Sequence, residues 1–245
     1  MLGYSGNTDV VQKSFIMPKS SGKRGVSLNS EVAFILNQDQ PSESESVSNK
    51  TFVLFGNPRG GTTMIANVVR SMGVFLGNDL PINLEDNGFN WDILARQEPE
   101  PSRADKITSI KKVIKDRNAQ YDVWGWKYPR ADVYFKGISP ALVNPMLICV
   151  FRDVVASTWR GVVRRRQEPL NLMRRALDLQ SSNLRLIEES KLPTLLVSYE
   201  KAIADPLQLV TSLNRFMSLG LSHDELATHV EKVNPELGYG ASLSR

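Results

Sequence analysis

A glycine-rich loop follows a short apolar segment near residue 51, and its residue types suit the binding of a phosphate-like anion. Residues 56–63 read GNPRGGTT, with two glycines at the spacing of the nucleotide P-loop G-x-x-x-x-G-K-[ST]. Thr62 stands where that motif has lysine, Thr63 fills the hydroxyl position, and Arg59 is the nearest cation. Backbone N–H groups of such a loop and of a following helix attract anions. We therefore expect a site for an anion less charged than a Mg²⁺-bound triphosphate.

Two other apolar segments end in basic residues. Lys127 closes the segment YDVWGWK, and Arg152 directly follows PMLICVF, the most strand-like run of the chain. Ligands of open α/β sheets bind at the carboxyl ends of the strands. We therefore expect Lys127, Arg152 and the loop around Arg59 to lie at one edge of a sheet.

The elements that must position these residues alternate between strands and helices. Apolar runs predict strands at residues 51–55, 121–128, 145–151 and 192–199. Helical spacing and capping signals predict helices from residue 62, over 102–118, from 154, and over 169–189, 206–217 and 222–233. This alternation favours an α/β domain of three α/β/α layers with a mainly parallel sheet. We expect that domain at residues 51–245, after a flexible tail at 1–50 in which residues 31–36 form a short strand or a docking segment.

Composition narrows the class of protein. The chain has 245 residues, 41% of them hydrophobic, and a net charge of +4, a mild basic excess that favours anionic ligands. Its one cysteine, Cys149, lies in an apolar run, which predicts no disulfide and a reducing, cytoplasmic setting. No apolar run reaches the ~20 residues of a membrane span, and the first residues lack a secretory pattern. Aromatic residues other than Trp159 do not interleave with the basic ones, so a nucleic-acid partner is not expected.

Several motifs together resemble the sulfotransferase family, in its bacterial form. PRGGTT resembles the family's 5′-phosphosulfate loop, PRSGTT or PKSGTT, and WGWKYPR resembles WGWKDPR. FRD after the third predicted strand and SYEKAIADP near residue 200 also match the family pattern, in the right order, over about residues 51–220. The resemblance implies transfer of a sulfonate group from 3′-phosphoadenosine 5′-phosphosulfate (PAPS) to a hydroxyl acceptor, without a metal ion.

The resemblance also implies roles for single residues. The phosphosulfate loop corresponds to Arg59, Gly60, Gly61, Thr62 and Thr63. Lys127 corresponds to the lysine beside the transferred sulfonate, where it would act with Arg59 on the bridging oxygen.

The site for the 3′-phosphate departs from the family pattern. That pattern has an arginine after the strand and a serine eight positions later. Here the arginine is Arg152, the eighth position is Arg160, and Ser157 fits only with a deletion of three residues. We favour Arg152 and Arg160, with Ser157 in reserve. Tyr128 and Val154 replace the family's usual Asp and Pro.

A carboxylate is the favoured general base, because the two histidines, His223 and His229, both lie on the last predicted helix. Glu85 is the first candidate and Asp86 the alternative, since NLEDNGF resembles part of the family segment G-x-[FW]-E-[DH]. The acceptor class stays open among glycans, lipids and small metabolites. A degenerate P-loop kinase and a non-catalytic nucleotide- or anion-binding protein of the same fold are the alternatives.

Overall fold

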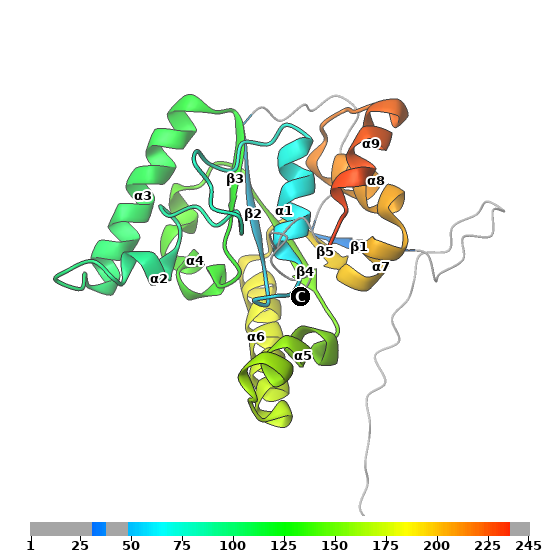
Figure 1. The fold of residues 1–245 in the computed structure, drawn as a ribbon. Coiled ribbons are helices and arrows are strands. Elements are labelled where there is room, and N and C mark those ends of the chain that lie inside the picture. The colour runs from blue at the N-terminus through cyan, green and yellow to red at the C-terminus, as the bar shows by residue number, and fades with distance from the viewer. Residues whose placement is uncertain (1–30, 38–48, 236–245) are drawn as a thin grey trace, which may run out of the picture. The chain divides into compact units, whose positions relative to one another are not determined.

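The computed structural model of the protein describes residues 31–37 and 49–235 (Figure 1). Its strands are β1 (Ala33–Leu36), β2 (Lys50–Gly56), β3 (Val123–Lys127), β4 (Pro145–Phe151) and β5 (Thr194–Ser198). They form one sheet in the order β1-β5-β4-β2-β3. All neighbours are parallel except β1, which runs antiparallel to β5. The prediction of an α/β domain with a mainly parallel sheet is confirmed.

Helices cover both faces of this sheet. They are α1 (Thr62–Ser71), α2 (Trp91–Leu94), α3 (Arg103–Gln120), α4 (Phe135–Ile138), α5 (Val154–Arg165), α6 (Pro169–Ser190), α7 (Tyr199–Ala204), α8 (Pro206–Met217) and α9 (His223–His229), with short 3₁₀ turns at Ala131–Val133, Ser139–Ala141 and Val230–Lys232. Apolar residues of α1, α8 and α9 pack on one face of the central strands. Those of α3, α4 and α6 pack on the other. The three-layer prediction is confirmed.

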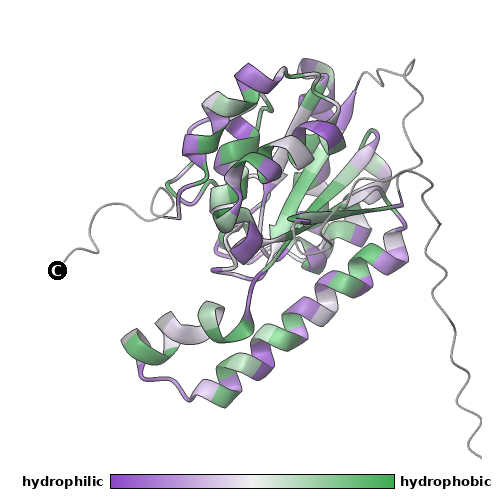
Figure 2. Ribbon diagram, turned by 90° about the vertical axis from the view of Figure 1, so that its right-hand side faces the viewer, coloured by the Kyte–Doolittle hydropathy of each residue, from purple (hydrophilic) through white to green (hydrophobic). Residues whose placement is uncertain are grey.

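Central strands are apolar on both faces, because each face meets a layer of helices. In β2, Phe52 and Leu54 belong to one core cluster, and Val53 and Phe55 to the other. Figure 2 shows the resulting run of hydrophobic residues along the sheet.

Register brings the strand ends together. Leu54 of β2 pairs with Lys127, Gly56 pairs with Val150 of β4, and Phe151 pairs with Ser198 of β5. The loop after β2 therefore lies between the carboxyl ends of β3 and β4, as the topology predicted.

Residues 31–36, for which the sequence left a short strand and a docking segment open, contain a strand. Ala33–Leu36 forms the edge strand β1, with Ala33 paired to Val197. Val32 and Ala33 are buried in the core. The apolar patch is therefore part of the sheet, where β5 holds it in place. Residues 1–30 and 38–48 of the predicted tail lie outside the described residues.

Candidate functional site

The loop between β2 and α1 requires glycine for steric reasons. Gly61 has φ +91°, and a Cβ there would overlap the ring of Tyr199. A Cβ on Gly60 would lie 2.7 Å from the carbonyl oxygen of Asn57, which accepts a hydrogen bond from the Gly60 N–H. The close packing of the backbone at both positions therefore leaves no room for a side chain.

Helix α1 begins without a capping side chain. Gly61 is its N-cap residue, makes no side-chain cap, and no acidic residue occupies the first turn. In contrast, the serines that precede α3 and α9 form capping boxes, as the sequence predicted. The N-terminal N–H groups of α1 therefore meet no side-chain cap and carry the partial positive charge of the helix end.

Asn57 fixes the loop against α6. It is buried, and its Nδ2 donates to the carbonyl oxygen of Ala176 at 2.8 Å. The Nδ2 of Asn183 donates to the Oδ1 of Asn57 at 3.4 Å. These contacts hold the loop to a helix that follows it by more than a hundred residues.

Lys127 is the central basic residue of the site. It is 2% exposed, and its Nζ donates to Glu85 Oε1 at 2.8 Å and to the carbonyl oxygen of Asn83 at 3.1 Å. The same carbonyl accepts from Thr63 Oγ1 at 3.3 Å. The structure therefore connects the end of β3, the first turn of α1 and the segment that carries Glu85.

Glu85 is held through both carboxylate oxygens. Asn90 Nδ2 donates to Oε2 at 3.1 Å, while Lys127 occupies Oε1. Asn90 is itself fixed, because its Oδ1 caps α2 through the N–H groups of Asp92 and Ile93. The carboxylate is thus positioned by a side chain whose rotamer serves a second purpose.

Burial lowers the pKa of the Lys127 ammonium. The charge and hydrogen bond of Glu85 act in the opposite direction and offset only part of that shift. Desolvation disfavours the charged lysine, so its proton is easier to release than that of an exposed lysine.

Arg152 lies against the other side of the loop. Its Nη1 donates to the carbonyl oxygen of Arg59 at 2.9 Å, and its guanidinium lies 4.4 Å from the ring centroid of Tyr199. Its Nε is 3.7 Å from Glu200 Oε1, an ion-pair distance that is too long for a hydrogen bond. That buried Nε has no hydrogen-bond partner.

A cavity of about 180 Å³ lies beside the loop, between α5 and α6. Arg59, Ser157 and Arg175 are among its lining residues. Ser157 Oγ donates within its own helix, to the carbonyl oxygen of Val154 at 3.0 Å. Arg160 lies on α5, but its side chain falls outside what the structure describes.

Asp86 contacts different residues from Glu85. It forms an ion pair with Arg117 of α3 and accepts a hydrogen bond from the Gly88 N–H at 2.7 Å. Both side chains of the pair are 11% exposed. The alternative base therefore joins its own loop to α3, apart from Lys127.

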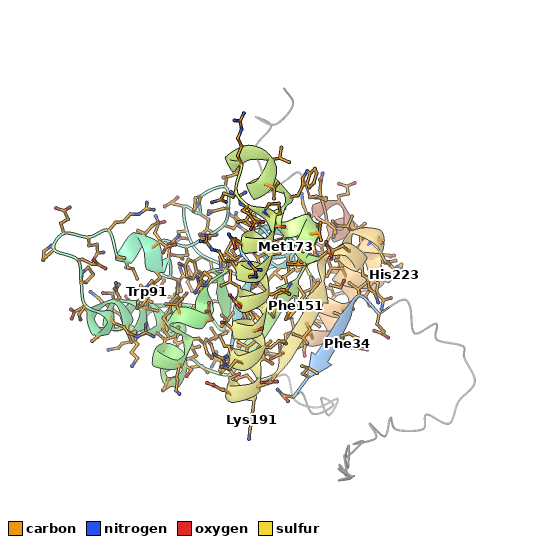
Figure 3. All side chains as sticks on the ribbon, turned by 90° about the horizontal axis from the view of Figure 1, so that it is seen from below. Phe34, Trp91, Phe151, Met173, Lys191 and His223 are labelled. Carbon is orange, nitrogen blue, oxygen red and sulfur yellow. The ribbon has the colours of Figure 1, made fainter. Side chains whose placement is uncertain are left out.

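The remaining predicted positions have ordinary contacts. Tyr128 donates through its hydroxyl to Asp92 at 3.2 Å, and burial, with the charge of Asp92, raises its pKa. His229 Nδ1 lies 3.1 Å from Ser71 Oγ. In Figure 3, His223 and Trp91, the neighbour of Asn90, lie on opposite sides of the molecule.

Sequence reasoning missed Asn57, Asn83 and Asn90 as residues of the candidate site. Asn90 carried a local signal, since asparagine before an apolar turn is a good helix cap. Asn57 and Asn83 act through a tertiary contact or a backbone carbonyl, which no local pattern marks.

Within residues 31–37 and 49–235, no group of three or more His, Cys, Asp or Glu side chains could hold a metal ion. No helix in that part of the chain is long and apolar enough to cross a membrane.

No protein-family description and no curated protein matches this sequence. Two solved structures are similar in fold. The sulfotransferase domain from the Synechococcus PCC 7002 olefin synthase has a TM-score of 0.48 and 19% identity, with 77% of this chain and 79% of that chain covered. The sulfotransferase domain from the curacin biosynthetic pathway has a TM-score of 0.49 and 14% identity, with 76% and 78% covered.

Proposed function

We propose that the protein transfers a sulfonate group from PAPS to the hydroxyl group of an acceptor. The observation that carries this proposal is the ion pair of the buried Lys127 with the partly buried Glu85, joined through the carbonyl oxygen of Asn83 to the first turn of α1. Lys127 and Glu85 thereby lie beside the loop that we expect to bind the anion. Group transfer to a hydroxyl needs such a cation to stabilise charge and such a carboxylate to accept the proton.

The residues fit the donor on two points. The loop places glycine where a Cβ would collide with Tyr199 or with the Asn57 carbonyl oxygen, and the N-terminus of α1 makes no side-chain cap. Beside it, the buried Nε of Arg152 lacks a hydrogen-bond acceptor, which a phosphate oxygen would supply. Arg59 to Thr63 would hold the 5′-phosphosulfate, and Arg152 the 3′-phosphate. Ser157 and Arg160 remain the candidates for the second contact to that phosphate.

Lys127 would stabilise charge on the oxygen that leaves the sulfonate group. Burial lowers the pKa of the ammonium, and it also strengthens the interaction of this charge with a nearby anion. Arg59, in the loop, would share this role. The donor supplies the transferable sulfonate group, and the protein contributes position and charge.

Glu85 would accept the proton of the acceptor hydroxyl. Lys127 and Asn90 orient the Glu85 carboxylate, so little conformational entropy is lost when it accepts the proton. The hydroxyl acceptor could be a carbohydrate, a lipid or a small metabolite.

Calorimetry with 3′-phosphoadenosine 5′-phosphate tests the first step. We expect binding without added metal, and Arg152→Lys should weaken it at least about tenfold, because an ammonium loses the forked geometry of guanidinium. Arg130→Lys is the control, since Arg130 pairs with Asp132 and is 41% exposed. Absence of binding by the wild type would sink the proposal.

Incubation with radiolabelled PAPS and panels of hydroxylated glycans, lipids and metabolites tests transfer. Mg²⁺-dependent ATP binding in place of PAPS binding would favour the degenerate P-loop kinase. Nucleotide binding without transfer to any acceptor would favour the non-catalytic protein.

A further inference from the structure

Helices α5 and α6 form a hairpin that projects from the carboxyl edge of the sheet, as Figures 1 and 2 both show. The two helices pack closely where Gly161 meets Leu172, because a Cβ on Gly161 would lie 2.8 Å from a Leu172 methyl group. The second half of α6 returns to the core through Asn183 and Ile187, which are buried. The first half and α5 leave much of their surface uncovered.

One face of α5 exposes large apolar side chains. Val155, Trp159 and Val163 are 53%, 63% and 58% exposed. Their spacing of four residues places them on one side of the helix. Ser157 and Gly161, which face α6 and its cavity, lie on the other side. This apolar stripe therefore points away from the rest of the fold.

Helix α6 adds exposed leucines to the hairpin. Leu170 and Leu177 are 57% and 50% exposed, seven residues apart and hence on one side of α6. Most large apolar residues of comparable size elsewhere in the described chain are buried. So much uncovered apolar surface on two adjacent helices marks an interaction site.

The hairpin is also basic. Residues 154–190 contain seven arginines, no lysine and four acidic residues, which is a net charge of +3 out of +4 for the whole chain. Six of the seven arginines lie within residues 160–175. Arg166 and Arg174, at the tip and on the first turns of α6, are exposed.

We propose that the α5–α6 hairpin docks on an anionic lipid surface. Helices that lie in the lipid interface combine exposed Trp, Val and Leu with many basic residues. Trp159 and the neighbouring apolar side chains would insert among the acyl chains, and acidic headgroups would attract the arginines.

Other partners fit this surface less well. A second copy of the chain would bring two arginine-rich hairpins together, and their repulsion disfavours such a dimer. Nucleic acid would leave the aliphatic residues in water. The proposal does not depend on sulfonate transfer.

Vesicle flotation of the full chain tests this proposal. With vesicles of phosphatidylcholine and about one-third phosphatidylserine, we expect binding at least about tenfold tighter than with phosphatidylcholine alone, weakened by salt. The double variant Trp159→Ser and Val163→Ser should lose at least about tenfold in binding. The matched control, Ile203→Ser with Leu207→Ser, removes apolar residues that are exposed on α7 and α8 and should bind like the wild type.

Charge is tested separately. Arg166→Gln with Arg174→Gln should weaken binding to the acidic vesicles, and Arg70→Gln with Arg96→Gln, exposed outside the hairpin, should not. Trp159 is the only tryptophan among the large exposed apolar residues, so its emission should shift to the blue on vesicle binding. Trp159→Phe should abolish that shift and still float.

Three results would overturn the proposal. They are no preference for acidic vesicles, equal loss of binding in the control variants, and a dimer in sedimentation velocity that Trp159→Ser with Val163→Ser dissociates. Because the substituted side chains are exposed, circular dichroism should show that each variant is folded. A loss of binding would then come from the changed hairpin surface and not from unfolding.

Discussion

The Nζ of Lys127 lies 2.8 Å from Oε1 of Glu85, although 42 residues separate them in the chain. An isolated parallel bridge between the two backbones supports the contact, so the segment that carries Glu85 runs along the end of β3. Lys127 and Glu85, predicted to act at the bridging oxygen and at the acceptor hydroxyl, are therefore neighbours.

Lys127→Ala should lower kcat about 10²–10³-fold, because it removes a buried donor from the proposed reacting centre. Affinity for 3′-phosphoadenosine 5′-phosphate should change little, and calorimetry measures it. Lys106→Ala is the control, since Lys106 is also buried but pairs with Glu100, outside the candidate site. An equal loss of turnover and nucleotide affinity in Lys127→Ala would reassign Lys127 to binding.

Glu85→Gln and Asp86→Asn separate the two candidate bases. Glu85→Gln should abolish most turnover and leave nucleotide binding in place, because an amide cannot accept the proton. Asp86→Asn should instead cost about 3–5 kcal/mol of stability, since it leaves Arg117 unpaired in a largely buried position. Urea unfolding and kcat at a temperature where both variants are folded distinguish the outcomes. The opposite pattern would make Asp86 the base.

Asn90→Asp should retain α2 but lower kcat. Aspartate caps a helix as well as asparagine does, so the contacts to the Asp92 and Ile93 N–H groups survive. Aspartate at position 90 cannot donate a hydrogen bond to Glu85, and it places a second negative charge beside the Glu85 carboxylate. Asn144→Asp, at the opposite end of β4, is the control. Unchanged turnover in Asn90→Asp at normal stability would show that Asn90 does not position Glu85.

The pKa of Lys127 makes a prediction about stability and pH. Burial lowers this pKa in the folded protein. At pH values between the lowered pKa and the ordinary value of 10.5, the unfolded chain therefore binds the proton of Lys127 more fully than the folded protein does. The free energy of unfolding contributed by this residue should therefore rise with pH, from the lowered pKa up to about 10.5. Urea unfolding of the wild type and Lys127→Met at several alkaline pH values gives the difference. A difference that falls with rising pH would contradict the lowered pKa.

Patterns within single segments predicted most of the fold. The strand at Pro145–Phe151 and the capping boxes at Ser102 and Ser222 were predicted because their signals are local. Topology then predicted that Arg59, Lys127 and Arg152 share one edge, since parallel strands end together. β1 was left open between a short strand and a docking segment, because its pairing with β5 depends on a segment about 160 residues away.

The site was less predictable than the fold. Pairing of Glu85 with Lys127 follows from a bridge between distant segments. Asn83 contributes through its backbone carbonyl oxygen, and the Asn57 side chain donates to the backbone carbonyl oxygen of Ala176. A sequence motif names the residues of one segment and cannot say which distant segment completes the network.

Gly61→Ala tests how closely the anion loop is packed. Gly61 and Gly73 both have positive φ, at +91° and +95°, so alanine strains the backbone at either position by about 1–2 kcal/mol. A Cβ at Gly73 meets nothing within 4 Å, whereas one at Gly61 overlaps Tyr199. Gly61→Ala should therefore cost about 1–3 kcal/mol more than Gly73→Ala in urea unfolding. It should also weaken nucleotide binding, because Tyr199 supports Arg152. Equal costs would mean that the ring of Tyr199 moves freely and does not hold the loop closed.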